Sequence, residues 1–179
     1  MSAAIDVLRH EHEAILVALQ VLERLAERAE QGAADTADIA AFVGFLREFA
    51  DTCHHGKEEG LLFPAMLAAG LPEQGGPIPV MLHEHEEGRA LVAAMDRASQ
   101  PALDAAAFAL AARAYAEHLR AHIRKENEVL FPMAEQIVPA QILAQLHGDF
   151  EQHEERVMGH GRHEQLHTML KDLKARYLD

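Results

Sequence analysis

Residues 54–64 read HHGKEEGLLFP, and residues 122–132 repeat the pattern as HIRKENEVLFP. Aligned without a gap, both segments begin with histidine, carry Lys-Glu at the fourth and fifth positions and end in Phe-Pro. A helix places residues four apart on one face, so His54 stacks on Glu58 and His122 stacks on Glu126. Two such pairs predict one shared metal site.

The repeat extends upstream of both segments. Residues 9–13 read RHEHE, and residues 82–86 read LHEHE. The chain therefore divides into two pseudo-repeated halves, about 1–70 and 77–136, each with a histidine-rich helix followed by a His-x-x-x-Glu helix. Internal similarity of this kind indicates two helical units packed together. A pseudo-twofold axis between them would bring four helices and their polar side chains to one point.

Composition agrees with a single helical domain. The chain has 179 residues, only 5% aromatic residues and no Trp, and it is rich in Ala, Leu and Glu, which favour helix over sheet. Its net charge of −13 argues against partners such as nucleic acid or an anionic membrane surface. Cys53 is the one cysteine, which excludes an intramolecular disulfide and a cysteine-based zinc cluster.

The chain carries no recognisable targeting or membrane segment. The first residues lack the basic region and apolar run of a signal peptide. No uncharged apolar stretch reaches the about 18 residues that span a bilayer. We therefore expect a cytoplasmic protein.

The helical pattern predicts an all-α, up-down-up-down four-helix bundle over residues 1–136. The four helices are expected at about 2–32, 35–70, 79–98 and 103–137, with a break at 75–79. Pro64 and Pro132 fall two turns past the histidine of each repeat and should kink or end their helices. An additional C-terminal helix, interrupted near 159–161, forms an extension over 137–179 packed on the bundle.

The candidate metal ligands are four imidazoles and two carboxylates: His12, His54, Glu58, His85, His122 and Glu126. Nitrogen and oxygen donors without thiolate suit iron, manganese or zinc. Helix bundles build dinuclear carboxylate sites from side chains on facing helices. Two metals would each receive two imidazoles, both carboxylates could bridge, and open positions would admit a small exogenous ligand.

The pattern of a lone histidine, His-x-x-x-Glu, a second lone histidine and a second His-x-x-x-Glu resembles the hemerythrin-like (HHE cation-binding) domain family. The resemblance covers roughly residues 1–136 and includes the Lys-Glu and Phe-Pro tails of both repeats. It implies a four-helix bundle around two iron ions, a non-heme di-iron centre with an oxo or hydroxo bridge. Glu58 and Glu126 would then be the bridging carboxylates.

One departure from the family concerns the third helix. Oxygen-carrying hemerythrins have a further histidine ligand one turn from the one that matches His85, but this chain has Arg89 and Met81 at those positions. The absence argues against simple reversible oxygen carriage. His118 or Tyr115 on the fourth helix is a candidate replacement.

Several neighbouring groups are weaker candidates. Three histidines lie one or two residues from a predicted ligand and are expected to face elsewhere around the helix: His10, His55 and His83. His55 and Glu59 form a four-residue pair of their own, but the second copy has Ile123 and Asn127 there, so the alignment argues against them. Whether Glu59 or the C-terminal helix adds a ligand is left open.

A rival motif lies in the C-terminal extension. Residues 163–167 read HEQLH, which satisfies the His-Glu-x-x-His zinc signature of metalloproteases through His163, Glu164 and His167. Only 12 residues follow the motif and no strand is evident to hold a peptide. A ferritin-like site needs Glu-x-x-His on two helices, and the chain has it only at Glu164 and His167.

The sequence thus predicts a non-heme di-iron binding protein whose open coordination site takes O2, NO or peroxide, in sensing, buffering or detoxification. The alternative is a di-iron oxidoreductase that acts on peroxide or NO or repairs iron centres. Iron storage and a zinc metalloprotease rank lower. Beyond the metal ligands the sequence indicates no separate catalytic residue, and a protein partner or a homo-oligomer is compatible with it.

Overall fold

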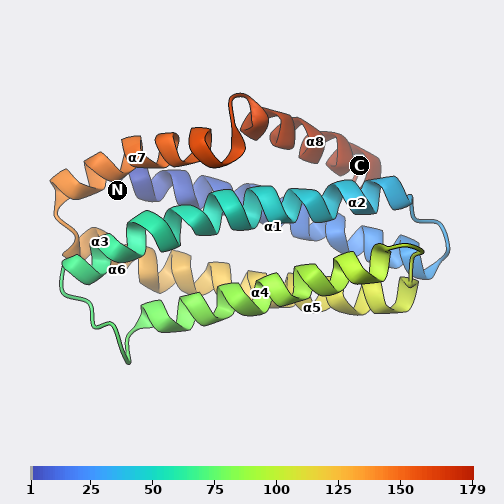
Figure 1. The fold of residues 1–179 in the computed structure, drawn as a ribbon, viewed down its shortest axis with the longest axis horizontal. Helices are drawn as coiled ribbons and strands as arrows, with labels where there is room; N and C mark the ends of the chain where they lie inside the picture. The colour runs from blue at the N-terminus through green and yellow to red at the C-terminus, as the bar shows by residue number, and fades with distance from the viewer. Residues whose placement is uncertain (1) are drawn as a thin grey trace.

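The computed structural model describes residues 2–179, and within them all regular structure is helical (Figure 1). Four long helical segments form the bundle, and two of them contain wider π turns (η). In chain order these segments are α1 (Ala3–Glu30); α2 (Thr36–Phe45), η1 (Leu46–His55), η2 (Glu58–Leu62) and α3 (Phe63–Ala68); α4 (Pro77–Ser99); and α5 (Ala105–Lys125), η3 (Glu126–Leu130) and α6 (Phe131–Ile137).

Consecutive segments run antiparallel, up, down, up and down, as Figure 1 shows. Helix α5 packs against both α1 and α4, which closes the bundle. The predicted all-α bundle is therefore confirmed. No helix in residues 2–179 has the combination of length and apolar character needed to cross a membrane.

The C-terminal extension covers one side of the bundle. It forms two helices, α7 (Ala140–Met158) and α8 (Arg162–Tyr177), and both contact α1. The chain breaks between them at Gly159 and Gly161, whose φ angles of +83° and +74° lie in the left-handed region that favours glycine. The single additional helix is thus divided at the predicted interruption.

The two repeated prolines do not end their helices. Instead, the Phe63 N–H donates to the Glu58 carbonyl and the Phe131 N–H donates to the Glu126 carbonyl, five residues back in each case. Each proline then falls in the first turn of the next helix, where its missing N–H is tolerated. A π turn therefore begins at each predicted carboxylate ligand, and such turns are frequent at functional sites.

The interior of the bundle has two apolar cores with a polar layer between them. Along α1, Leu8 belongs to the first core and Ile15 to the second, with the buried Glu11 and His12 between them. The other three bundle segments also place their buried polar residues between the two cores. The layer consists mainly of groups that soluble proteins bury only when they are paired or bind a cation: Glu11, His12, His54, His55, Lys57, Glu58, His85, His122 and Glu126.

The larger core predicts a strong packing effect at Phe45, which is buried and stacks on Phe49 with ring centroids 5.1 Å apart. Phe45→Ala should lower the free energy of unfolding by about 3–5 kcal/mol, because it removes a buried ring and leaves a cavity. Leu110, 75% exposed, supplies the control, and Leu110→Ala should change it by less than about 0.5 kcal/mol. Urea denaturation measures both, and equal effects would contradict this packing.

Candidate metal centre

The polar layer brings all six predicted ligands together, one or two from each of the four bundle segments. Each of their side chains is buried. Their donor atoms fall into two groups, within each of which the atoms lie no more than 4.8 Å apart. One group contains His12, His54, Glu58 and Glu126, and the other contains His55, Glu58, His85 and His122. That these side chains ligate a metal stays a prediction.

Glu126 presents one carboxylate oxygen to each side of the layer. Its Oε2 lies 3.1 Å from His12 Nε2. Its Oε1 lies 3.1 Å from His122 Nε2 and 3.9 Å from His85 Nε2. The two oxygens of one carboxylate thus face imidazoles from different halves of the chain.

Glu58 is placed in the same way on the neighbouring segment. Its Oε1 lies 3.7 Å from His54 Nε2, and its Oε2 lies 3.4 Å from His85 Nε2. Both carboxylates therefore stand between a pair of histidines from the first half and a pair from the second. This is the arrangement that two carboxylates bridging two metals would require.

Most donor atoms of this layer lack hydrogen bonds, although the Nε2 atoms of His85 and His122 lie 3.1 Å apart and bond each other. Both carboxylate oxygens of Glu58 and of Glu126, and the Nε2 atoms of His12 and His54, are buried without a hydrogen-bond partner among the described residues. Buried polar atoms are rarely left unsatisfied, because desolvation costs about 1–3 kcal/mol each and more for charged groups. Nitrogen and oxygen donors in this number fit iron or a similar cation.

Polar side chains hold the outer nitrogens of the four predicted imidazole ligands. Every Nδ1 lies 2.7–3.0 Å from a carboxylate or amide oxygen. The pairs are His12 with Asn127, His54 with Glu11, His85 with Glu59, and His122 with Glu84. Such contacts fix the tautomer and the ring orientation of metal-binding histidines, and they point each Nε2 into the layer.

These supporting contacts follow the internal repeat. Lys57 bonds Glu11, and Lys125 bonds Glu84, so each repeated lysine holds the glutamate that precedes the lone histidine of its own half. The two halves differ in exposure, because helix α7 covers the first. Lys57 is buried and also donates to Glu154 at 3.1 Å, whereas Lys125 is half exposed.

The charges of the layer shift its acid–base behaviour strongly. Burial by itself raises the pKa of Glu11. The His54 imidazole and the Lys57 ammonium group outweigh burial and lower that pKa to about 2. Burial by itself lowers the pKa of His85, and the carboxylates of Glu126 and Glu58 outweigh it and raise that pKa to about 11. Imidazolium–carboxylate pairs therefore balance the metal-free layer, and a bound cation would take the place of those protons.

The structure corrects the expectation that His55 faces elsewhere. His55 is buried, and its ring stacks on His85 with centroids 3.8 Å apart. Adjacent residues of a regular α-helix point about 100° apart, but His54 and His55 close the π segment η1, where a turn holds more residues and adjacent side chains diverge less. The alignment missed His55 because Ile123 occupies the equivalent position.

The other open candidates lie outside the two groups of donor atoms. Glu59 supports the layer from outside, where it accepts hydrogen bonds from His85 and Arg89. The His118 Nε2 donates to the backbone carbonyl of Glu84 at 2.8 Å, so that histidine is already satisfied. The supporting roles of Glu11 and Glu84 went unpredicted, although each directly precedes a lone histidine in the repeated HEHE motif.

The zinc signature of the extension is not assembled as a metalloprotease site. His163 and His167 have ring centroids 4.6 Å apart, but the group of donor atoms that contains His163 is completed by Glu11 and Glu154. Glu164, the residue that would act as general base, is exposed on α8. Lys57 already bonds both Glu11 and Glu154, which supplies this outer group with a cation of its own.

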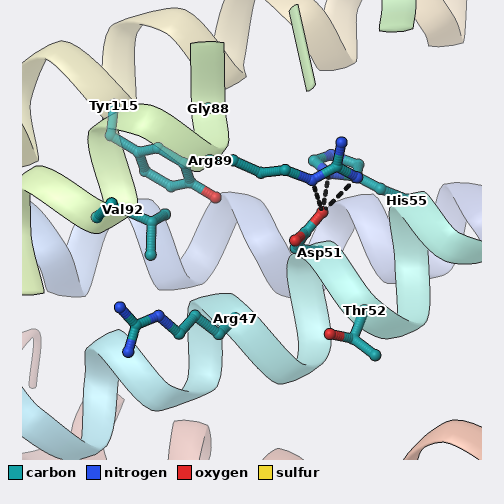
Figure 2. A pocket seen from close by; sticks show the side chains of 9 residues that line it. Arg47, Asp51, Thr52, His55, Gly88, Arg89, Val92 and Tyr115 are labelled. Carbon is teal, nitrogen blue, oxygen red and sulfur yellow. Dashed lines mark hydrogen bonds and ion pairs between the residues drawn. The ribbon is translucent and has the colours of Figure 1, made fainter. Parts of the chain in front are cut away.

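A cavity of about 360 Å³ reaches the polar layer between η1, α4 and α5. Figure 2 shows His55 and Arg89 meeting at Asp51, with the Tyr115 hydroxyl directed into the same space. Arg47 lines the outer part. The cavity is large enough for a small molecule and has cationic groups in its wall.

Comparison with known proteins agrees with this geometry. Residues 3–134 match the family model of the hemerythrin HHE cation-binding domain. The chain is also 33% identical over 141 residues to the iron-sulfur cluster repair protein DnrN of Neisseria gonorrhoeae, an alignment that covers 72% of this chain and 88% of the relative. No solved structure gives a significant match. The chain belongs to the hemerythrin HHE cation-binding family.

The central carboxylates give the first prediction for this site. Glu126→Ala should reduce bound iron from the predicted two ions per chain to fewer than one, because it removes the carboxylate whose two oxygens face histidines of both halves. It should also abolish the rise in melting temperature that iron produces, since that rise depends on binding to the folded state. Metal analysis and calorimetry of the iron-loaded protein measure both effects.

Two variants serve as controls for this measurement. Glu128→Ala changes an exposed carboxylate two residues away and should leave the iron content unchanged. His163→Ala should also leave it unchanged, and a loss of metal in that variant would move the site to the outer group formed with Glu11 and Glu154. Full iron content in Glu126→Ala would contradict the assignment.

Acid should destabilise the metal-free protein through Glu11. The pKa of this carboxyl is about 2 in the folded protein and near 4.5 in the unfolded chain, so its contribution to stability is complete above pH 4.5 and is lost as the pH falls toward 2. The urea midpoint should therefore drop between about pH 5 and about pH 2. Glu11→Gln should flatten that slope, and an identical slope in the variant would contradict the pairing with His54 and Lys57.

Proposed function

We propose that this protein binds two iron ions in the polar layer and acts in the repair of iron–sulfur clusters. The observation that carries the proposal is the pair of buried carboxylates, each with one oxygen facing a histidine of the first half and the other oxygen facing a histidine of the second half. None of these oxygens is hydrogen-bonded among the described residues. The relationship to an iron-sulfur cluster repair protein supports the choice of reaction.

The proposed donors divide evenly between the two irons. His12 and His54 would hold one ion and His85 and His122 the other, with the central carboxylates bridging them. Bound iron would supply exchangeable coordination positions and one-electron redox change. The protein residues keep each Nε2 directed inward through the Nδ1 contacts, and the two apolar cores exclude bulk water from both sides.

The repair reaction can be tested on a [4Fe–4S] enzyme whose cluster has lost one iron by oxidation. The iron-loaded protein, incubated anaerobically with this damaged enzyme and a thiol reductant, should restore the cluster absorbance and the activity of the target enzyme. Glu126→Ala should restore neither, and the exposed Glu128→Ala should match wild type. Equal recovery with Glu126→Ala would contradict the proposal, as would equal recovery with the same amount of free ferrous iron.

The cavity supports a second candidate function, binding of a small exogenous ligand. A space of about 360 Å³ that ends at the polar layer, with Arg47 and Arg89 in its wall, suits O2, NO, peroxide or a small anion. Titration of the iron-loaded protein with NO or azide should change its near-ultraviolet and visible bands saturably. Absence of any spectral change up to millimolar ligand would contradict this function and leave the repair function to be judged by its own assay.

A further inference from the structure

The polar layer contains a fifth inward-facing imidazole. His55 Nε2 is buried and makes no hydrogen bond with any described residue. A ring nitrogen of His55 lies within 4.8 Å of donor atoms of Glu58, His85 and His122. The outer nitrogen of His55 is held like those of the four predicted ligands, because Nδ1 lies 3.3 Å from Asp51 Oδ1. A carboxylate outside and a free nitrogen inside are the features of a metal-binding histidine.

Two other buried or partly buried histidines, His118 of the bundle and His153 of the extension, lack this combination. His118 Nε2 bonds the backbone carbonyl of Glu84 at 2.8 Å, and His153 Nε2 bonds that of Thr52 at 3.2 Å. Their ring nitrogens are thus used in packing helices together. With Nδ1 protonated toward Asp51, His55 presents a lone pair at Nε2 to the centre of the layer.

Arg89 links His55 to the rest of the centre. Its Nε donates to Asp51 Oδ1 at 2.8 Å, and its guanidinium also donates to Glu59 at 2.7 Å. Asp51 supports the ring of His55, while Glu59 supports the ring of His85. One guanidinium group on α4 therefore fixes the carboxylates behind two stacked imidazoles.

We propose that His55 is a metal ligand, so that the ion held by His85 and His122 has three imidazoles and the other ion has two. This inference rests on the proposed two-iron site. The two ions would then differ in their access to the cavity, because His55 lines the cavity while His85 and His122 do not. The three-histidine ion faces the cavity, and an exogenous ligand that enters there meets His55 first.

Iron binding by four proteins tests this assignment: wild type, His55→Phe, His55→Gly and His118→Gly. His55→Phe keeps a ring of similar size against His85 but removes the nitrogen, and His55→Gly opens an imidazole-sized space beside the cavity. Metal-free proteins, checked for helix content by circular dichroism, are titrated with ferrous iron against a chelator. His55→Gly is then titrated again with ¹⁵N-imidazole present, and pulsed EPR of the mixed-valent state detects nitrogen bound to iron.

Wild type and His118→Gly should bind two irons alike. His55→Phe and His55→Gly should bind one of the two at least about tenfold more weakly. Imidazole should restore the affinity of His55→Gly, with a ¹⁵N coupling in its EPR spectrum. Wild-type affinity in His55→Phe would overturn the inference, and so would a weakened His55→Gly that imidazole does not restore. Fewer than two irons in wild type would instead overturn the two-iron site itself.

Discussion

The structure depends on the burial of two carboxylates, Glu58 and Glu126, at the centre of a helical bundle. Burying a carboxylate is costly unless it is paired, and here each one faces imidazoles from both halves of the chain without a hydrogen bond among the described residues. A cation bound between them would offset that cost, because it would satisfy the unpaired carboxylate oxygens and imidazole nitrogens together. The polar layer, and the carboxylates that orient its histidines, follow from this requirement.

The rest of the fold positions this layer. Apolar cores on both sides of the layer fix how far each of the four segments is shifted along the bundle axis. A π turn starts at each central glutamate, so that the proline that follows falls in the first turn of the next helix. The extension adds an asymmetry that the internal repeat lacks. Helix α7 buries Lys57 with Glu154 over the first half, while the equivalent Lys125 is half exposed. Only the second half therefore keeps its repeated lysine accessible to solvent.

The repeat was enough to predict the bundle and the convergence of six side chains, because a metal site selects residue types at fixed helical spacing. The repeat could not predict the inward position of His55, because it identifies only residues that occur in both halves. Ile123 occupies the equivalent position of the second half. The inward orientation of His55 arises from the π geometry of η1, which α-helical spacing does not describe. The role of Arg89 depends on long-range contacts with Asp51 and Glu59, and no local pattern in the sequence reports them.

Anomalous X-ray diffraction at the iron edge, on crystals of the iron-loaded protein, tests the central claim most directly. Two anomalous peaks should appear between Glu58 and Glu126, one beside His12 and His54 and the other beside His85 and His122. A single peak at that place would contradict a two-iron centre. A peak only beside His163 and Glu154, with none in the polar layer, would contradict the whole assignment.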